Sequence, residues 1–117
     1  MVVGGGLVGT ELAEFLAERG RSVTVLEEGD DLATEMAHPR RWRALHEARD
    51  HGVDFRTGAH LVAITPDEVV AAVTGGDGAV TEERFSVDAV LLAGGVEPDL
   101  SLADAIQTAV GDAVGVH

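Results

Sequence analysis

The sequence predicts an α/β fold in three layers, with a central parallel β-sheet and an inserted antiparallel β-meander. Three observations support this prediction. In the first half of the chain, short apolar runs alternate with segments of helical periodicity, which is typical of strand–helix–strand units. Three β-rich runs separated by tight turns then follow. A continuous apolar run near the C-terminus finally returns the chain to the parallel sheet.

The N-terminal residues predict one strand–helix–strand unit. Residues 1–3 are apolar and lead directly into glycines, as expected of a buried strand followed by a turn. From Leu7, apolar side chains recur at helical spacing until Gly20, which ends the helix. Residues 23–26 predict a second buried strand, and the helical crossover makes the two strands parallel.

A second helix and a third strand continue the alternation. Pro39 suits the first turn of a helix, because proline lacks the N–H that this turn leaves unpaired. The helix contains Trp42 and Leu45 and ends before Gly52. Residues 53–55 then predict a short strand.

The meander and the last two elements complete the predicted fold. Tight turns separate three β-rich runs, at residues 61–65, 68–73 and 79–85. Residues 89–93 predict a further strand of the parallel sheet, because the run is apolar throughout. Residues 100–110 predict a short helix.

Composition and charge limit the classes of protein. A length of 117 residues with 45% apolar content predicts a single domain over residues 1–117. The net charge of −13 disfavours nucleic acid and anionic membranes as partners, since both attract basic proteins. The lack of cysteine excludes disulfides and thiolate-bound metals. We expect a cytoplasmic location, because the sequence shows neither a bilayer-spanning apolar run nor a basic signal region.

A glycine motif between the first strand and the first helix carries the predicted chemistry. Gly4, Gly6 and Gly9 form the pattern GxGxxG. The first glycine permits the tight turn, the second lets a pyrophosphate approach the backbone, and the third lets the helix pack closely on the strand. The start of the helix offers free N–H groups and a partial positive charge to phosphate, so an acidic protein can still bind an anionic ligand there.

An acidic residue at the end of the second strand completes the dinucleotide pattern. Glu27 lies roughly 20 residues after the motif, where a carboxylate accepts hydrogen bonds from the adenosine ribose. A carboxylate disfavours a 2′-phosphate, and no Arg lies between Glu27 and Arg40. NAD(H) is therefore favoured over NADP(H). From the residues alone, an empty glycine turn, an FAD/ADP-binding domain and a non-catalytic dinucleotide-sensing module remain alternatives.

Three segments of the chain resemble a known family. Residues 2–11, 23–27 and 90–99 are similar to the NAD(P)H-binding, Rossmann-like domain of the pyridine-nucleotide-dependent flavoprotein oxidoreductases. The likeness is closest to the NADH:flavin oxidoreductases related to old yellow enzyme and dienoyl-CoA reductase, and it covers nearly the whole chain. It implies an oxidoreductase in which this domain presents reduced nicotinamide to FAD or FMN for hydride transfer.

The resemblance also implies individual site residues. Glu11 corresponds to an acidic position near the nicotinamide end, and Ala93-Gly94 to a stretch beside the dinucleotide, although this chain lacks the family's threonine there. No residue is predicted to be a catalytic acid, base or nucleophile, and no metal site is predicted. The predicted cofactor-binding set is Gly4, Gly5, Gly6, Leu7, Val8, Gly9, Glu11, Glu27, Glu28, Ala93 and Gly94.

The same resemblance predicts parts that this sequence does not contain. Relatives carry a flavin-binding motif upstream and a Gly-Asp motif downstream, for which Val110-Gly111-Asp112 is a poor candidate and the region after residues 114–117 a better one. We therefore expect a catalytically incomplete fragment whose partner is the flavin-binding domain of the parent enzyme. Apolar surface left by that partner makes self-association a hypothesis.

Histidine and arginine clusters favour structural roles. His46 and His51 lie five residues apart on the second helix and point to different faces, so surface positions are favoured over a metal site. The run Arg40, Arg41 and Arg43 favours solvated helix charge over phosphate binding.

Overall fold

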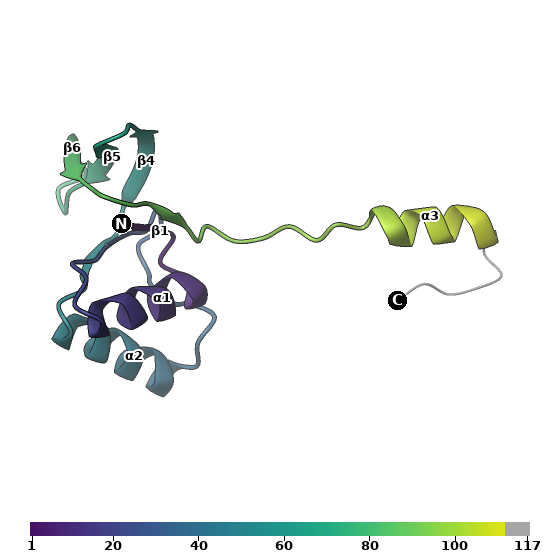
Figure 1. Ribbon diagram of the computed structural model, residues 1–117, viewed down its shortest axis with the longest axis horizontal. Helices are drawn as coiled ribbons and strands as arrows, with labels where there is room; N and C mark the ends of the chain where they lie inside the picture. Colours follow the sequence, from purple (N-terminus) through teal and green to yellow (C-terminus); the bar gives the residue numbers. More distant parts are fainter. Residues whose placement is uncertain (112–117) are drawn as a thin grey trace.

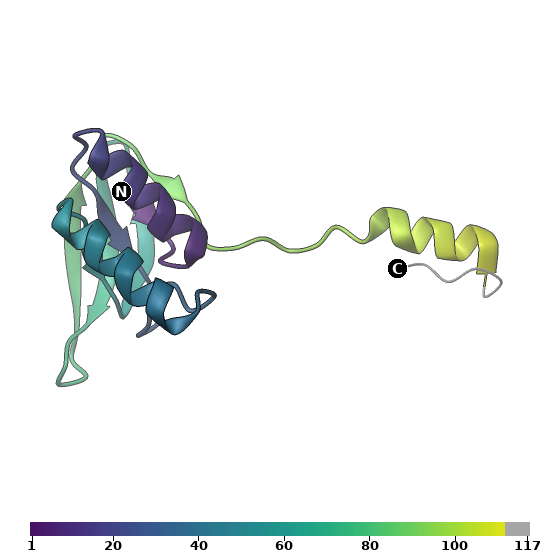
Figure 2. The same ribbon diagram turned by 90° about the horizontal axis from the view of Figure 1, so that it is seen from below.

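A helical layer, a parallel sheet and an antiparallel sheet lie one above the other in the computed structural model, which describes residues 1–111 (Figures 1 and 2). The elements are β1 (Val2–Val3), α1 (Leu7–Glu18), β2 (Thr24–Leu26), α2 (His38–Asp50), β3 (Asp54–Arg56), β4 (Ala59–Ile64), β5 (Glu68–Thr74), β6 (Val80–Ser86), β7 (Leu91–Leu92) and α3 (Ser101–Val110). The predicted three-layer fold and each predicted element are confirmed, with ends that shift by one or two residues.

The middle layer is a four-stranded parallel sheet in the order β3-β2-β1-β7. Val2 of β1 pairs with Val25 on one side and with Leu91 on the other. The strand predicted at residues 89–93 is shorter, but backbone hydrogen bonds continue beyond it, from Ala93 N–H to the Val3 carbonyl at 2.7 Å. The glycine turn therefore leaves the sheet from a central strand.

Helices α1 and α2 cover one face of the parallel sheet, as the view from below shows (Figure 2). Small residues allow this close approach, since Ala13 and Ala17 of α1 and Ala48 of α2 are buried against the strands. Val2 and Val25 contribute from the sheet side. The packing of Ala13 and Ala17 against Val2 holds α1 in place beside β1.

The meander β4-β5-β6 covers the opposite face of the sheet. Leu26 points to this side while its neighbour Val25 points to the helices, because successive side chains of a strand alternate. Leu26 packs with Ala59, Val69 and Ala71 in a second core. The meander thus rests on the end of β2, the strand that carries Glu27.

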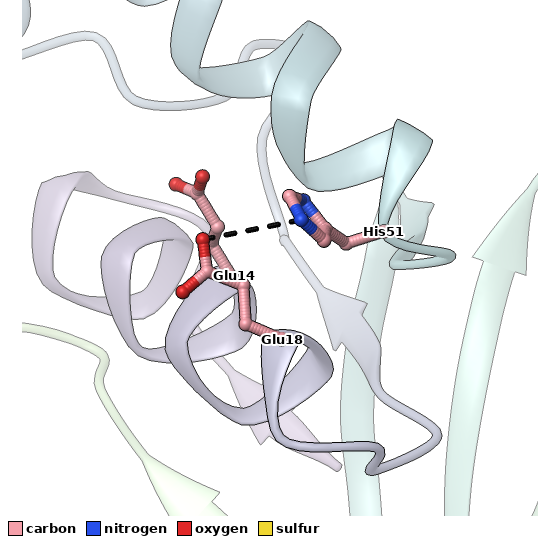
Figure 3. Close-up of side chains that lie close together, drawn as sticks. All are labelled: Glu14, Glu18 and His51. Carbon is pink, nitrogen blue, oxygen red and sulfur yellow. Dashed lines mark ion pairs between the residues drawn. The ribbon is translucent and has the colours of Figure 1, made fainter.

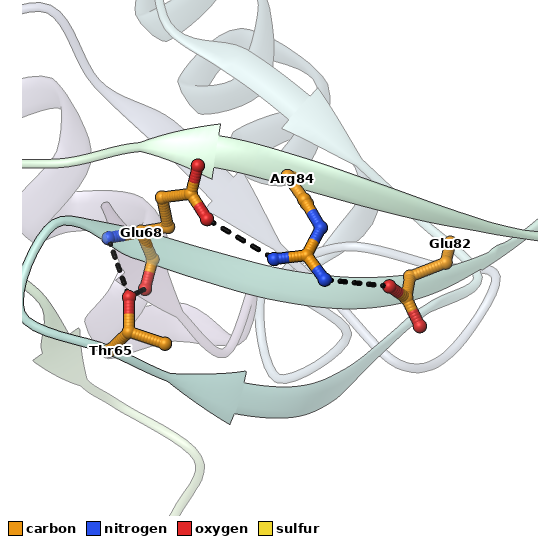
Figure 4. Close-up of polar contacts among 4 residues, drawn as sticks. All are labelled: Thr65, Glu68, Glu82 and Arg84. Carbon is orange, nitrogen blue, oxygen red and sulfur yellow. Dashed lines mark hydrogen bonds and ion pairs between the residues drawn. The ribbon is translucent and has the colours of Figure 1, made fainter.

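Charged side chains occupy the outer face of the meander (Figure 4). Arg84 of β6 pairs with Glu68 across the strands at 3.3 Å and with Glu82 along its own strand at 3.3 Å. The Glu68 backbone N–H donates to the Thr65 hydroxyl at 3.1 Å in the turn before β5. These pairs lie away from the parallel sheet and its edge.

Helix α3 stands away from the three layers, at the end of an extended segment (Figures 1 and 2). None of its residues is buried. Within the described residues, no helix has both the length and the apolar character needed to cross a membrane. The candidate motif at Val110-Gly111-Asp112 and the run 114–117 extend outside the described residues.

Candidate functional site

A pocket of about 710 Å³ opens at the carboxyl edge of the parallel sheet. Its walls come from the glycine turn, the end of β2, the loop 31–35, the start of β4 and the segment after β7. In open α/β sheets this edge is where ligands bind, at the point where neighbouring connections diverge from a central strand. The volume lies within the range of small-molecule sites, about 300–1,000 Å³.

The glycine turn brings distant segments into close contact at this edge. Gly4 has a φ of +109°, and a Cβ there would overlap the Ala93 carbonyl. A Cβ at Gly9 would overlap the Gly4 carbonyl. These two glycines therefore permit backbone packing between the turn, α1 and the segment after β7, and they place Ala93 and Gly94 in the pocket wall.

The N-terminus of α1 faces the pocket. Gly6 is the N-cap residue, and its extended backbone leaves the Leu7 N–H pointing out of the helix. The buried Thr10 hydroxyl donates to the Gly5 carbonyl at 3.3 Å and ties the turn to the helix. The Leu7 N–H donates to the carboxylate of Glu35 at 3.1 Å. A negatively charged group thus already lies where the helix start favours one.

Glu27 and Glu28 follow β2 directly and lie beside the turn. One carboxylate oxygen of Glu27 accepts the Gly5 N–H at 2.7 Å, and the other accepts the Gly29 N–H at 2.9 Å. Glu28 contacts the Nδ1 atom of His60 on β4 at 2.8 Å. Both acidic side chains are pocket residues, so the end of β2 presents carboxylates to a ligand.

Most of the predicted cofactor-binding residues meet in this pocket. Those lining it are Gly4, Gly5, Gly6, Val8, Glu27, Glu28, Ala93 and Gly94. Leu7 reaches it through its N–H, and Gly9 lies behind the turn. Glu11 lies elsewhere, in a shallower depression beside α2 where it pairs with Arg40 at 3.4 Å. Its role near a nicotinamide stays a prediction.

Glu35 and His60 are pocket residues that no sequence motif predicted. Glu35 belongs to a loop of irregular structure, and His60 to the meander, so neither has a fixed spacing from the glycine motif. The acidic residues after β2 could have indicated Glu35, because the loop that follows β2 must pass the carboxyl edge of the sheet. Among residues 1–111, no Lys or Arg lines the pocket.

The arginine run has a structural role. Arg41 is only 23% exposed at its side chain; its Nε donates to the Leu32 carbonyl at 2.6 Å, and its guanidinium pairs with Asp31 at 3.2 Å. Solvated charge, the interpretation favoured from the sequence, is therefore wrong for Arg41, because tertiary packing turns it towards the loop. Arg40 and Arg43 are exposed.

A second group of ionisable side chains lies at the other end of α1 (Figure 3). The ligand-type atoms of Glu14, Glu18 and His51 lie within 4.8 Å of one another, and Glu18 is 4.0 Å from the His51 Nε2. Partial burial raises the pKa of Glu14, and repulsion from Glu18 and Glu47 adds to the effect, while His51 opposes it. His46 and His51 thus each lie beside an exposed carboxylate, that of Asp50 at 3.5 Å and that of Glu18 at 4.0 Å. The structural role expected for these two histidines stays a prediction.

The fold and the pocket together define a Rossmann-like, nucleotide-binding α/β domain. A family model for pyridine nucleotide-disulphide oxidoreductases matches residues 1–116, and the chain belongs to this family. The members of the family are redox flavoproteins, so the flavoprotein relationship predicted from the sequence is confirmed at this level.

Individual relatives are similar along most of this chain. A NADH oxidase of Thermoanaerobacter brockii is 39% identical over 71 residues, 61% of this chain and 11% of that protein. A nitric oxide reductase FlRd-NAD(+) reductase of Salmonella schwarzengrund is 32% identical over 117 residues, 99% of this chain and 30% of that protein. The chain thus spans less than a third of these relatives.

A solved structure shows the same architecture. A 2-naphthoyl-CoA reductase in complex with 2-naphthoyl-CoA superposes with a TM-score of 0.78 at 25% identity, over 92% of this chain and 16% of that one. The three-layer arrangement is therefore shared with a reductase of much greater length.

Proposed function

We propose that the chain is the NAD(H)-binding domain of a flavin-dependent oxidoreductase and presents reduced nicotinamide to a flavin. One observation carries the proposal: the start of α1, the glycine turn and the carboxylate of Glu27 converge on a single pocket at the carboxyl edge of the parallel sheet. These are the donors and the acceptor that an adenosine diphosphate group requires.

The residues present fit such a ligand. The Leu7 N–H at the helix start can donate to a diphosphate, and Gly6 carries no side chain that would block its approach. Glu27 can accept the ribose hydroxyls in place of the Gly5 N–H. Ala93 and Gly94 form the wall on the β7 side. A bound flavin would accept the hydride, while this chain binds and orients the dinucleotide.

The preference for NAD(H) over NADP(H) rests on local charge. Glu27, Glu28 and Asp31 line the pocket together with Glu35, and no basic Lys or Arg side chain of residues 1–111 joins them there. A 2′-phosphate near Glu27 would meet carboxylates without a Lys or Arg of the pocket lining to pair with, and such like-charge contacts are unfavourable. The pocket therefore favours the dinucleotide with the lower charge.

Further parts of the proposal concern the parent enzyme. We propose that the parent enzyme is cytoplasmic and also contains a flavin-binding domain that holds FAD or FMN. The narrower likeness to relatives of old yellow enzyme and dienoyl-CoA reductase belongs to the proposal as well. The names of the two curated relatives, a NADH oxidase and a NAD(+) reductase, support a pyridine nucleotide as the ligand of the family.

Calorimetric titration with NADH, NADPH and FAD tests the proposal. We expect NADH to bind more tightly than NADPH, and FAD to bind more weakly than NADH. An absence of NADH binding at millimolar concentration would refute the proposal. Tighter binding of FAD would instead favour the ADP half of a flavin as the ligand. Binding of NADH in a protein encoded without any flavin-binding region would favour a sensing module.

Glu27→Arg tests the assignment of the ribose site. The substitution removes the acceptor of the Gly5 N–H and adds a cation, so we expect NADH to bind about tenfold more weakly and NADPH to lose less or to gain. Asp67→Arg makes the same charge change in an exposed turn of the meander and serves as the control. Unchanged affinities for both dinucleotides in Glu27→Arg would remove Glu27 from the site.

A further inference from the structure

The carboxylate of Glu35 lies at the N-terminus of α1, the position proposed above for a diphosphate. Its Oε2 atom accepts the Leu7 N–H at 3.1 Å. A Cβ built on Gly6 would lie only 2.7 Å from its Oε1 atom, so the carboxylate rests against the glycine at which a phosphate would approach. Two independent features, a hydrogen bond and a close approach, therefore place Glu35 in the anion-binding part of the pocket.

The loop that carries Glu35 is held against the glycine turn. The Ala33 N–H donates to the Gly5 carbonyl at 2.7 Å, and the Met36 N–H donates to the Ala33 carbonyl at 3.0 Å. Leu32, Ala33 and Met36 are buried. Arg41 fixes the same loop through the Leu32 carbonyl. The backbone on either side of Glu35 is thus anchored, and its side chain is directed to the helix start.

We propose that Glu35 is an internal competitor for the diphosphate subsite and regulates the affinity of this pocket. The inference rests on the proposed function. The Leu7 N–H cannot donate fully to both groups, and two anions at one helix start repel each other. A dinucleotide must therefore displace the carboxylate, which turns towards solvent while the anchored loop stays in place. When the carboxylate returns, it again satisfies the helix N–H and opposes rebinding.

Three variants separate this competition from a general effect of charge. Glu35→Ala removes the competitor, whereas Glu35→Gln keeps an acceptor for the Leu7 N–H but removes the charge. Asp30→Ala removes one negative charge from an exposed position just before the loop 31–36, and Asp30 does not line the pocket. Titration of the whole chain with NADH and with inorganic pyrophosphate then compares the three variants with the unaltered protein.

We expect Glu35→Ala to bind both ligands about tenfold more tightly, because the ligand no longer displaces a charged hydrogen-bond partner. Glu35→Gln should give a smaller gain, and Asp30→Ala a change of less than about twofold. Equal NADH affinity in Glu35→Ala and the unaltered protein would overturn the inference and leave the proposed function standing. A gain in Asp30→Ala as large as that in Glu35→Ala would also overturn it, since charge alone would then explain the effect.

A measurement without ligand keeps the two proposals distinguishable. In ¹⁵N-labelled protein the Leu7 amide resonance should shift in Glu35→Ala and stay in place in Asp30→Ala, because the carboxylate of Glu35, and not that of Asp30, accepts that N–H. A Leu7 resonance that is the same in all proteins would refute the position of Glu35 and with it the inference. Failure of NADH to bind any variant would refute the proposed function, and the Leu7 resonance would still decide where Glu35 lies.

Discussion

At the scale of single residues, Gly9 packs closely against the backbone of the glycine turn, and a substitution tests this packing. Gly9→Ala would drive its Cβ into the Gly4 carbonyl, and backbone must move to relieve the overlap. We expect a loss of about 2–3 kcal/mol in the free energy of unfolding, measured with urea. Gly76→Ala is the matched control, because no described atom lies within 4 Å of the added methyl group. Equal losses in both variants would contradict the close packing.

Glu14 carries a pH dependence that can be predicted in sign. A raised carboxyl pKa means that the folded chain binds the proton more tightly than the unfolded chain, so ionised Glu14 lowers stability above its ordinary pKa of 4.5. Glu14→Gln should therefore increase the free energy of unfolding at neutral pH, by about 0.3 kcal/mol for like charges on a helix surface. The gain should vanish at about pH 3, where both states are protonated. A gain that is equal at both pH values would refute this cause.

The residues of the site differ in how far sequence predicts them. Gly4, Gly6 and Glu27 follow from local spacing, because a turn and a strand end have fixed positions along the chain. Glu35 does not, since its contact with Leu7 depends on how the loop 31–36 folds against the turn. Glu11 is a different case: the family resemblance, and not the glycine motif, implies its role at the ligand, and in the structure it pairs with Arg40 and does not line the pocket. Its role at the ligand stays a prediction.

At the scale of elements, β5 packs against the end of β2, which forms one wall of the pocket. It is hydrogen-bonded on both sides within the meander, and its Val69 is fully buried against Leu26 at the end of β2. Val69→Ala should lower the free energy of unfolding by about 2 kcal/mol through lost burial and a residual cavity. Val62→Ala, in β4 and 54% exposed, should change it by less than about 0.5 kcal/mol. Similar losses in chemical denaturation would contradict this account of the second core.

Element types were predictable because each has its own apolar period or turn residues. The ends were less so: β4 begins at Ala59 and not at Leu61, since pairing with Val73 continues the ladder. Strand β7 is shorter than its apolar run, because only Leu91 and Leu92 pair with β1 as a ladder. Pairing partners, and not hydrophobicity alone, set these boundaries.

At the scale of the whole molecule, α3 leaves an apolar side uncovered. Leu102, Ile106 and Val110 recur every four residues and are 71%, 40% and 40% exposed. We expect the chain to self-associate through this side at high concentration, which light scattering would detect as a mass above that of one chain. The double variant Leu102→Glu, Ile106→Glu should suppress association without changing the free energy of unfolding, because α3 has no buried residue. A monodisperse single chain at millimolar concentration would refute this expectation.

The sequence by itself determined the fold class, the order of the elements and the glycine turn with its acidic partner Glu27. These features depend on residues close together in the chain, whose periodicity and backbone freedom are local properties. Only the tertiary structure decided three contacts. Glu35 lies at the start of α1, and His60 contacts Glu28. Arg41 donates to the Leu32 carbonyl and so holds the loop that carries Glu35. Those contacts join segments that come together only when the three layers pack, so no local pattern encodes them.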